Sequence, residues 1–184
     1  ILKTSEFGYD GKGQYKIENG KIKSFRNLNL KNFILEELLD YEKEISVIVC
    51  RKNKEVKPYP VVENIHKNSI LRETIYPANL DSNVSKNATK IAIQIANELD
   101  LNGILAVEMF LMKDRSIIIN ELAPRPHNSG HWTLDYCNVS QFENLINTIF
   151  FESPKCPSPS APCKMVNVIG DDFLNKDEFK KKFK

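Results

Sequence analysis

The chain has 184 residues, of which 41% are hydrophobic and 27% are charged. This composition is typical of a globular protein and excludes a disordered one. Lys and Arg number 26 against 24 Asp and Glu, so the net charge of +2 gives no electrostatic reason to expect nucleic-acid or membrane-surface binding. Since no apolar run approaches the roughly 18 residues of a transmembrane helix, we predict a protein that binds neither nucleic acid nor a membrane.

The four cysteines, at positions 50, 137, 156 and 163, form neither a CxxC pair nor a metal-ligand spacing with a histidine. We expect reduced thiols in a cytoplasmic protein, with Cys50 buried in its apolar run. A disulfide between Cys156 and Cys163 is the alternative in an oxidising compartment.

Neither end of the sequence has the features of a natural terminus. Ile1 is not an initiating Met, no signal-peptide pattern follows it, and the last residues are a lysine-rich run. We therefore interpret the chain as an interior piece of a longer protein.

Glycine is scarce, and three of the seven glycines lie in the segment Gly8-Tyr9-Asp10-Gly11-Lys12-Gly13-Gln14. Such a cluster gives the backbone freedom and allows close approach to another group. A hairpin turn and a phosphate-cradling loop are both consistent with the spacing. The motifs of a P-loop and of dinucleotide folds are absent. Asn19-Gly20 predicts a further two-residue turn.

Residues 44–51 are rich in β-branched side chains and predict a buried strand. Two more strands are predicted at 59–66 and 70–76, with prolines marking their ends. Apolar residues at the helical period predict a helix over 83–99, closed by Asn102-Gly103.

Strands are then predicted at 104–112 and 116–122, and a helix at 140–151 that begins with a capping box of Ser140 and Glu143. Residues 153–163 are rich in Pro and Ser and indicate a linker or boundary. A short strand at 165–169 and a lysine-rich helix complete the chain. This order of elements predicts an α+β fold.

The strands 104–112 and 116–122 predict a hairpin that brings two carboxylates together. A loop of two residues, 114–115, or of four, 113–116, sets the same register, in which Glu108 stands opposite Glu121. Their Cβ atoms would then be about 4.5–5.5 Å apart. A one-residue slip would put the two carboxylates on opposite faces.

Apolar neighbours on both strands predict that the carboxylates are buried. A buried pair of like charges must share a proton, find cations or bind a metal. Mg²⁺ takes carboxylate oxygens and brings substrate phosphates with it, which favours a magnesium site. The alternative is that one Glu faces solvent and pairs with a lysine.

A constrained polar segment follows directly, with the sequence Pro124-Arg125-Pro126-His127-Asn128-Ser129-Gly130-His131-Trp132. The prolines restrict the backbone, and Arg125 suits bidentate contact with phosphate or carboxylate. His127 and His131 are four residues apart, but the Pro and Gly neighbours argue against a helical zinc pair. Proton handling or anion binding is the expected role of these histidines.

Four segments, in order along about the first 170 residues, resemble the family of N5-carboxyaminoimidazole ribonucleotide synthetases, the ATP-grasp carboxylating ligases of purine biosynthesis. They are the glycine segment 8–14, Tyr-Pro-Val-Val-Glu-Asn-Ile-His at 59–66, the segment 120–133 and Met-Val-Asn-Val-Ile-Gly at 165–170. The resemblance implies that ATP phosphorylates bicarbonate, and that the carboxyphosphate or its CO₂ carboxylates the exocyclic amine of 5-aminoimidazole ribonucleotide. It also implies Mg²⁺ as a cofactor and a homodimer in the full-length protein.

The resemblance further implies roles for individual residues. It gives nucleotide contacts to Lys3, to Gly8, Tyr9, Asp10, Gly11, Lys12, Gly13 and Gln14 of the loop, to Glu36, Glu37, Leu38 and Leu39 of a hinge, and to Glu44, His66, Asn120 and Glu121. Glu108 and Glu121 match magnesium ligands, in agreement with the hairpin register. Tyr9 and Asp10 resemble residues beside the acceptor amine, and Arg125 and His127 resemble those near bicarbonate and the transferred phosphate. Asp10, Arg125 and His127 are the expected catalytic residues.

The implied fold is ATP-grasp, with antiparallel sheets and flanking helices, lacking the N-terminal α/β domain and the C-terminal end of the family. We predict a partial lid at 1–36, a core with the Mg-ATP site at 37–152, and a linker with the start of a truncated subdomain at 153–184. Such a piece is expected to have little or no synthetase activity alone. The alternatives are another ATP-grasp ligase such as a biotin carboxylase, a formate-using formyltransferase, or a non-catalytic nucleotide-binding or dimerisation module.

Overall fold

The computed structural model describes residues 1–6, 13–18, 21–22, 32–150 and 153–170. Residues 8–12 of the glycine segment, with the expected site residues Gly8, Tyr9, Asp10, Gly11 and Lys12, lie outside the described residues, as does the expected lysine-rich helix. The chain divides into two compact units, one of residues 1–40 with 66–70 and one of residues 41–65 with 71–184. Among the described residues, no helix is long and apolar enough to cross a membrane.

The N-terminal unit contains short antiparallel strands. β1 (Leu2–Thr4) lies between β2 (Gln14–Tyr15) and β5 (Phe33–Leu35), and the rings of Tyr15 and Phe33 meet edge to face at 6.1 Å. β3 (Ile17–Glu18) pairs with β4 (Lys21–Ile22), and the predicted turn residues Asn19 and Gly20 lie outside the described residues.

The larger unit is built on a seven-stranded sheet with the order β11-β10-β6-β8-β9-β12, in which β7 also pairs with β6. The strands are β6 (Tyr41–Lys52), β7 (Glu55–Pro58), β8 (Val62–Lys67), β9 (Ile70–Tyr76), β10 (Gly103–Met112), β11 (Ile117–Ala123) and β12 (Cys163–Val166). β10 pairs antiparallel with β6 and β11, and β6 pairs antiparallel with β7 and β8. The predicted α+β class is therefore confirmed, whereas β7 was not predicted, because we interpreted Pro58 only as an end marker.

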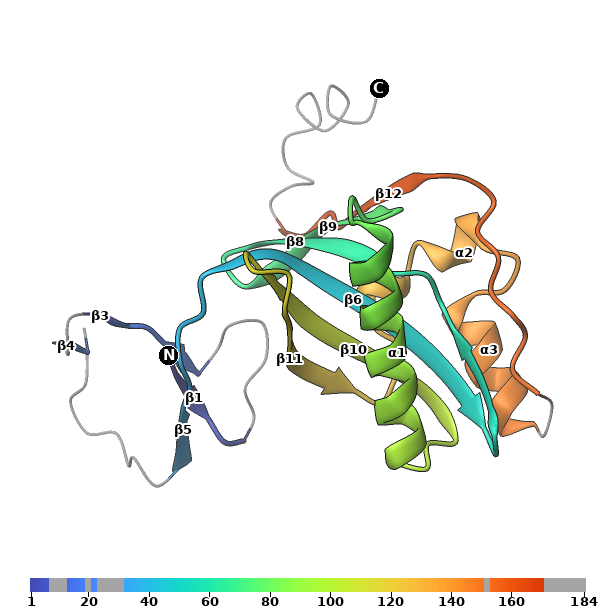
Figure 1. Cartoon of the computed structure of the whole chain (residues 1–184), viewed down its shortest axis with the longest axis horizontal. Coiled ribbons are helices and arrows are strands. Elements are labelled where there is room, and N and C mark those ends of the chain that lie inside the picture. The colour runs from blue at the N-terminus through green and yellow to red at the C-terminus, as the bar shows by residue number, and fades with distance from the viewer. Residues whose placement is uncertain (7–12, 19–20, 23–31, 151–152, 171–184) are drawn as a thin grey trace. The chain divides into compact units, whose positions relative to one another are not determined.

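The central strand β6 is buried on both faces. Helix α1 (Ser82–Glu98) covers one face of the sheet, and α3 (Gln141–Ile149) covers the other (Figure 1). Because side chains alternate along a strand, Ile45, Val47 and Val49 pack beneath α1, while the residues between them face the α3 side. This alternation decides which residues can reach the polar site described below.

Both ends of α1 are capped, but its C-terminus does not end at the predicted residues. Asp81 accepts hydrogen bonds from the first turn, as an N-cap should. At the other end, Asp100 rather than Asn102-Gly103 takes the left-handed conformation, with φ of 44°. The N–H of Leu101 then donates to the carbonyl of Ala96 at 3.0 Å. Asp tolerates this conformation better than most residues.

The helix predicted at 140–151 is α3, and its capping box is present: Ser140 Oγ accepts from the N–H of Glu143 at 3.1 Å. The Pro/Ser-rich segment after it is tied down, since the N–H of Lys155 donates to Asn144 Oδ1 at 2.8 Å and the N–H of Ser158 donates to Asn138 Oδ1 at 2.7 Å. All four cysteines are free thiols, and Cys50 is buried as predicted.

Candidate functional site

Strands β10 and β11 bring the two predicted metal-binding carboxylates face to face. Glu108 and Glu121 are direct cross-strand partners, which confirms the predicted opposition. The predicted loop length was wrong, because the turn has three residues: the N–H of Met112 donates to the carbonyl of Ser116 at 2.9 Å, and Arg115 takes φ of 71°.

The opposition of the two carboxylates depends on a β-bulge. Next to the turn, Met109 pairs with Ile119, and the register then shifts so that Glu108 pairs with Glu121. Asn120 is the extra residue of β11. With the turn's register continued, Asn120 would face Glu108, and Glu121 would turn to the other face of the sheet. The bulge therefore corrects a register that the turn alone would set wrongly for a carboxylate pair.

The two carboxylates differ in exposure, contrary to the expectation that both are buried. The side chain of Glu108 is only 13% exposed, whereas Glu121 is exposed. Val107 and Met109, the neighbours of Glu108 in β10, pack in the core beneath α1. Glu108 therefore lies on the face of the sheet that α1 does not cover.

The donor set fits Mg²⁺ better than a transition metal. Glu108 and Glu121 offer carboxylate oxygens, and Asn120, next to Glu121 in the chain, carries an amide oxygen. Within the described ranges, no three His, Cys, Asp or Glu side chains gather into a site that could hold a metal alone. Mg²⁺ is commonly bound by one or two carboxylates together with substrate phosphates, so two opposed glutamates suffice.

The polar segment after β11 carries His127 to the buried carboxylate. Its ring Nε2 lies 3.7 Å from Glu108 Oε1. Arg125 is exposed, and its Nη1 donates to the carbonyl of Pro126 at 3.1 Å. His131 lies elsewhere, with its ring against Phe142 at 5.6 Å between centroids. The structure thus brings only the first of the two histidines to the carboxylates.

A buried glutamine that sequence reasoning missed holds the main chain of His127. Gln141 Nε2 donates to the carbonyl of His127 at 2.7 Å, and the N–H of His127 donates to Gln141 Oε1 at 2.9 Å. Gln141 is the first residue of α3 and is fully buried. The only sequence signal for it was its place directly after the capping residue Ser140.

Glycine at position 130 lets this segment lie close to the sheet. A Cβ added there would be 2.1 Å from Ile48 Cδ1 and 2.7 Å from Gln141 Oε1. Gly130 closes the short 3-10 helix η2 (Asn128–Gly130), which is followed by α2 (Thr133–Tyr136). Any larger residue would push the segment off the sheet or displace Gln141.

The N-terminal unit gathers a second group of predicted nucleotide residues. Lys3 pairs across strands with Gln14, and its Nζ lies 2.6 Å from a carboxylate oxygen of Glu36. Gly13 has φ of 77° and would bring a Cβ to 2.4 Å from Thr4 Oγ1, so this end of the glycine segment requires glycine. Of the other hinge residues, Glu37 and Leu38 are exposed and Leu39 is half-buried.

Glu44, at the start of β6, is held by an aromatic neighbour. The hydroxyl of Tyr41 donates a hydrogen bond to the Glu44 carboxylate, and the ring of Tyr41 stacks on Phe110 at 4.3 Å. Burial, followed by this hydrogen bond and the charge of Glu44, raises the pKa of Tyr41 to about 12. His66 is half-buried in β8 and belongs to the unit of residues 1–40 with 66–70.

Comparison with known proteins agrees with this geometry. The ATP-grasp domain family matches residues 1–142. The chain belongs to the ATP-grasp family. It is 44% identical over 181 residues to an N5-carboxyaminoimidazole ribonucleotide synthase of Bacillus subtilis (strain 168), covering 94% of this chain and 46% of that relative.

Solved structures give the same picture for this ATP-grasp chain. The ADP complex of an N5-carboxyaminoimidazole ribonucleotide synthetase superposes with a TM-score of 0.85 at 42% identity, covering 98% of this chain and 49% of that one. An N5-carboxyaminoimidazole synthase of Aspergillus clavatus, in complex with ADP and 5-aminoimidazole ribonucleotide, superposes with a TM-score of 0.66 at 34% identity, covering 76% and 39%. The chain thus spans about half the length of the relatives it matches.

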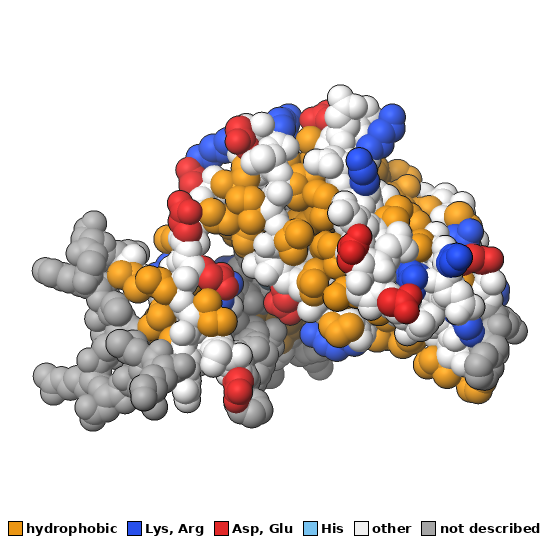
Figure 2. Space-filling view, turned by 60° about the horizontal axis from the view of Figure 1, so that its bottom comes forward, with side chains coloured by type: hydrophobic (Ala, Val, Ile, Leu, Met, Phe, Trp, Pro, Cys, Tyr) orange, Lys and Arg blue, Asp and Glu red, His pale blue; other side chains and the backbone are white. Residues whose placement is uncertain are grey.

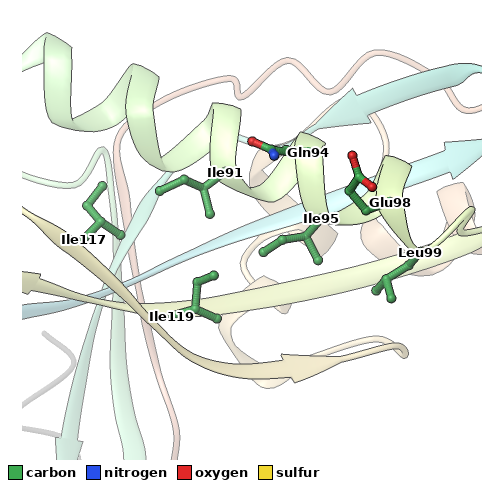
Figure 3. Close-up of a pocket in the computed structure, with 7 residues that line it drawn as sticks. All are labelled: Ile91, Gln94, Ile95, Glu98, Leu99, Ile117 and Ile119. Atoms are coloured by element: carbon green, nitrogen blue, oxygen red, sulfur yellow. The ribbon is translucent and has the colours of Figure 1, made fainter.

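A separate groove on the sheet is lined mainly by aliphatic side chains. About 380 Å³ in volume, it lies between α1 and β11 and is lined by Ile91, Gln94, Ile95, Glu98, Leu99, Ile117 and Ile119 (Figure 3). Glu98 is its sole ionisable group, and the groove lies on the α1 side, away from Glu108. On the face drawn in Figure 2, acidic and basic side chains are interspersed, which agrees with the small net charge.

Proposed function

We propose that this chain is the magnesium- and nucleotide-binding part of an N5-carboxyaminoimidazole ribonucleotide synthase that acts in purine biosynthesis. The observation that carries the proposal is the opposition of Glu108 and Glu121 across β10 and β11. Two such carboxylates suit the cation that accompanies the terminal phosphates of ATP. The relatives named above, one of which is 44% identical to this chain, support the carboxylating reaction over a formyl transfer.

The proposed reaction has two balanced steps. A bicarbonate oxygen attacks the terminal phosphorus of ATP, which forms carboxyphosphate and releases ADP. The exocyclic amine of 5-aminoimidazole ribonucleotide then forms a C–N bond with the carboxyl carbon, directly or through CO₂, and phosphate leaves as the amine loses a proton. Carboxyphosphate hydrolyses readily, so water must be kept away during the second step.

The residues of the larger unit have separable roles in this proposal. Glu108 and Glu121 would hold Mg²⁺, which neutralises charge on the transferring phosphoryl group when it is bound. Arg125 is exposed, and a guanidinium can contact two oxygens of a carboxylate or phosphate at once, so this side chain is suited to bicarbonate or to the transferred phosphate. His127 lies beside Glu108 and would contact bicarbonate and the transferred phosphate as well. Glu44 would hold the nucleotide ribose and Asn120 would contact its phosphates.

The remaining roles follow from the family resemblance. Lys3, the glycine segment, the hinge at 36–39 and His66 would contact the nucleotide, and Tyr9 and Asp10 would lie beside the acceptor amine. We propose a homodimer for the full-length protein and a cytoplasmic location, the latter supported by the four free thiols.

The proposal is tested by titrating Mg-ATP into the chain by calorimetry. Glu108→Ala/Glu121→Ala should weaken Mg-ATP binding by at least about tenfold, because the cation loses both protein oxygens. Glu143→Ala is the matched control, since it removes an exposed carboxylate that pairs with Lys155. Equal affinity in the double variant and the control contradicts the magnesium assignment.

The substrate is tested on the full-length protein that contains this chain. ATP hydrolysis should be stimulated by bicarbonate with 5-aminoimidazole ribonucleotide, and not by formate with glycinamide ribonucleotide. The reverse result would identify a formyltransferase. The chain by itself should show little synthetase activity, and full turnover by it would contradict the assignment as a part.

A further inference from the structure

A continuous chain of buried hydrogen bonds runs from strand β9 to the ring of His127. Thr74 Oγ1 donates to Asn64 Oδ1 at 3.2 Å, and Asn64 Nδ2 donates to Ser46 Oγ at 2.9 Å. Ser46 Oγ donates to Ser129 Oγ at 3.0 Å, and Ser129 Oγ lies 2.9 Å from His127 Nδ1. The chain links β9, β8 and β6 to the segment that carries the histidine.

All four links before the histidine are secluded from water. Ser46, Thr74 and Ser129 are fully buried, and Asn64 is 4% exposed. Burying polar groups in an apolar sheet is unfavourable unless each is hydrogen-bonded. Apolar residues of similar size would fill these positions more simply, so the chain of polar groups requires an explanation beyond packing.

One backbone group fixes the direction of every bond in the chain. The N–H of Ser129 can only donate, and it points to His127 Nδ1 at 3.3 Å, so this ring nitrogen must be the acceptor. The Ser129 hydroxyl must then also donate to Nδ1, and its oxygen is left to accept from Ser46. The donors at Asn64 and Thr74 point the same way. Bonds aligned in this manner polarise and strengthen one another.

Because Nδ1 of His127 accepts hydrogen bonds, the direction of the chain also decides where the ring proton lies. A neutral imidazole with a bare Nδ1 carries its proton on Nε2. In this structure Nε2 lies 3.7 Å from Glu108 Oε1, so the protonated nitrogen is the one beside the buried carboxylate of the opposed pair. Ser46 is also the cross-strand partner of Glu108 on β6, so its hydroxyl and the Glu108 carboxylate project from the same face of the sheet.

We infer that Ser46, Asn64, Thr74 and Ser129 form a positioning relay that fixes His127 as the Nε2–H tautomer, with the protonated nitrogen beside Glu108. These residues touch no reacting atom and act through the histidine. Their place in catalysis rests on the function proposed above, whereas the tautomer of His127 does not depend on it. The Gln141 clamp fixes the main chain of the same residue, so backbone and ring are held separately.

The first test needs neither nucleotide nor metal. In the chain labelled with ¹⁵N-histidine, at a pH where the ring is neutral, imidazole shifts should show a bare Nδ1 and a protonated Nε2 for His127, assigned with His127→Gln. A proton found mainly on Nδ1 overturns the inference. This outcome would leave the magnesium assignment unaffected, since Mg-ATP titration reports on that independently.

Variants along the relay should have graded effects on the same signals. Ser129→Ala should reduce the separation of the two ¹⁵N shifts most, Ser46→Ala less, and Thr74→Val least, because Ser129 contacts the ring, Ser46 is one link behind Ser129 and Thr74 is three links behind it. Ser46→Thr keeps the hydroxyl and should restore the wild-type shifts. Tyr59→Phe is the matched control, since it removes a buried hydroxyl bonded to Asn144 at 3.0 Å and not to the relay.

Kinetics of the full-length protein separate positioning from folding. Ser46→Ala should lower kcat about tenfold or more with KM for ATP nearly unchanged, and Ser46→Thr should recover most of the rate. If Ser129→Ala and Ser46→Ala move the His127 shifts no more than Tyr59→Phe does, the network is structural only and the inference fails. Thr74→Val, which is nearly isosteric, tests the same point should the serine variants fold poorly.

Discussion

The two faces of strand β6 are both buried, yet they carry different chemistry. Beneath α1 the residues are aliphatic or Met, with Ile45, Val47 and Val49 packed against a stripe of alanines on the helix. On the other face, the same strand contributes Ser46, which joins a network of hydrogen-bonded polar side chains. Alternate residues of this strand thus build the apolar core beneath α1, whereas Ser46, on the opposite face, joins the polar network and Ile48 joins a smaller apolar cluster.

The two faces constrain side chains in different ways, and hydrogen bonds to its main chain and ring hold His127 rigidly. A close-packed apolar face resists changes in volume, and a polar face resists rotation of its side chains once every donor has an acceptor. Substitutions on the α1 face should therefore lower the free energy of unfolding, whereas substitutions in the polar network should chiefly misplace the His127 ring. The first two predictions below test this division.

The largest effect is expected from Leu105→Ala. Leu105 is fully buried in the core beneath α1, so the truncation leaves a cavity and should lower the free energy of unfolding by about 2–5 kcal/mol. Urea denaturation measures this change. The Mg-ATP affinity of the folded protein should be unaltered. Leu99→Ala is the control, because Leu99 is 57% exposed and its truncation should change stability by about 0.5 kcal/mol or less.

A smaller loss of stability, about 1–3 kcal/mol, is expected from Gly130→Ala. Ile48 can swing its terminal methyl away from the new Cβ, but Gln141 cannot move without releasing His127. The variant should thus shift the ¹⁵N signals of His127, which Leu105→Ala should not. Urea unfolding measures the stability change, and histidine spectra measure the shifts. Equal movement of the His127 signals in Gly130→Ala and Leu105→Ala would contradict the division between the faces.

The third prediction concerns alkaline stability and Cys50. Burial raises the pKa of the Cys50 thiol from 9.0 to about 12, so the folded state holds its proton more tightly than the unfolded state. This contribution is fully present below pH 9 and is lost as the pH rises toward 12. Unfolding free energies of wild type and Cys50→Ala should therefore converge as the pH increases above 9. Parallel curves would contradict the raised pKa.

Much of the candidate site could be predicted from sequence because it lies within one hairpin. Local alternation and a short loop were enough to oppose Glu108 and Glu121, and Arg125 and His127 follow directly in the chain. The expected loop was nevertheless wrong by one residue. The unforeseen extra residue at Asn120 compensated for that error, so a correct pairing was reached through an incorrect turn.

The relay could not be predicted, because its members are distant in sequence and only the strand order brings them together. Ser46 and Ser129 are separated by 83 positions, yet their hydroxyls are hydrogen-bonded. A single hydroxyl within an apolar strand was the one signal at Ser46. The left-handed Asp100 was missed for a similar reason: its carboxylate accepts a hydrogen bond from Arg51 Nη2 at 2.8 Å, a partner 49 positions away.

The extra residue in β11 also gives a practical means of separating two properties of the hairpin. Deleting Asn120 would produce an uninterrupted ladder from the turn onward, in which Glu121 still stands opposite Glu108. Such a shortened hairpin would keep both acidic groups while losing the amide and the local kink of the strand. The contribution of strand geometry to cation capture could then be measured without altering the number of negative charges.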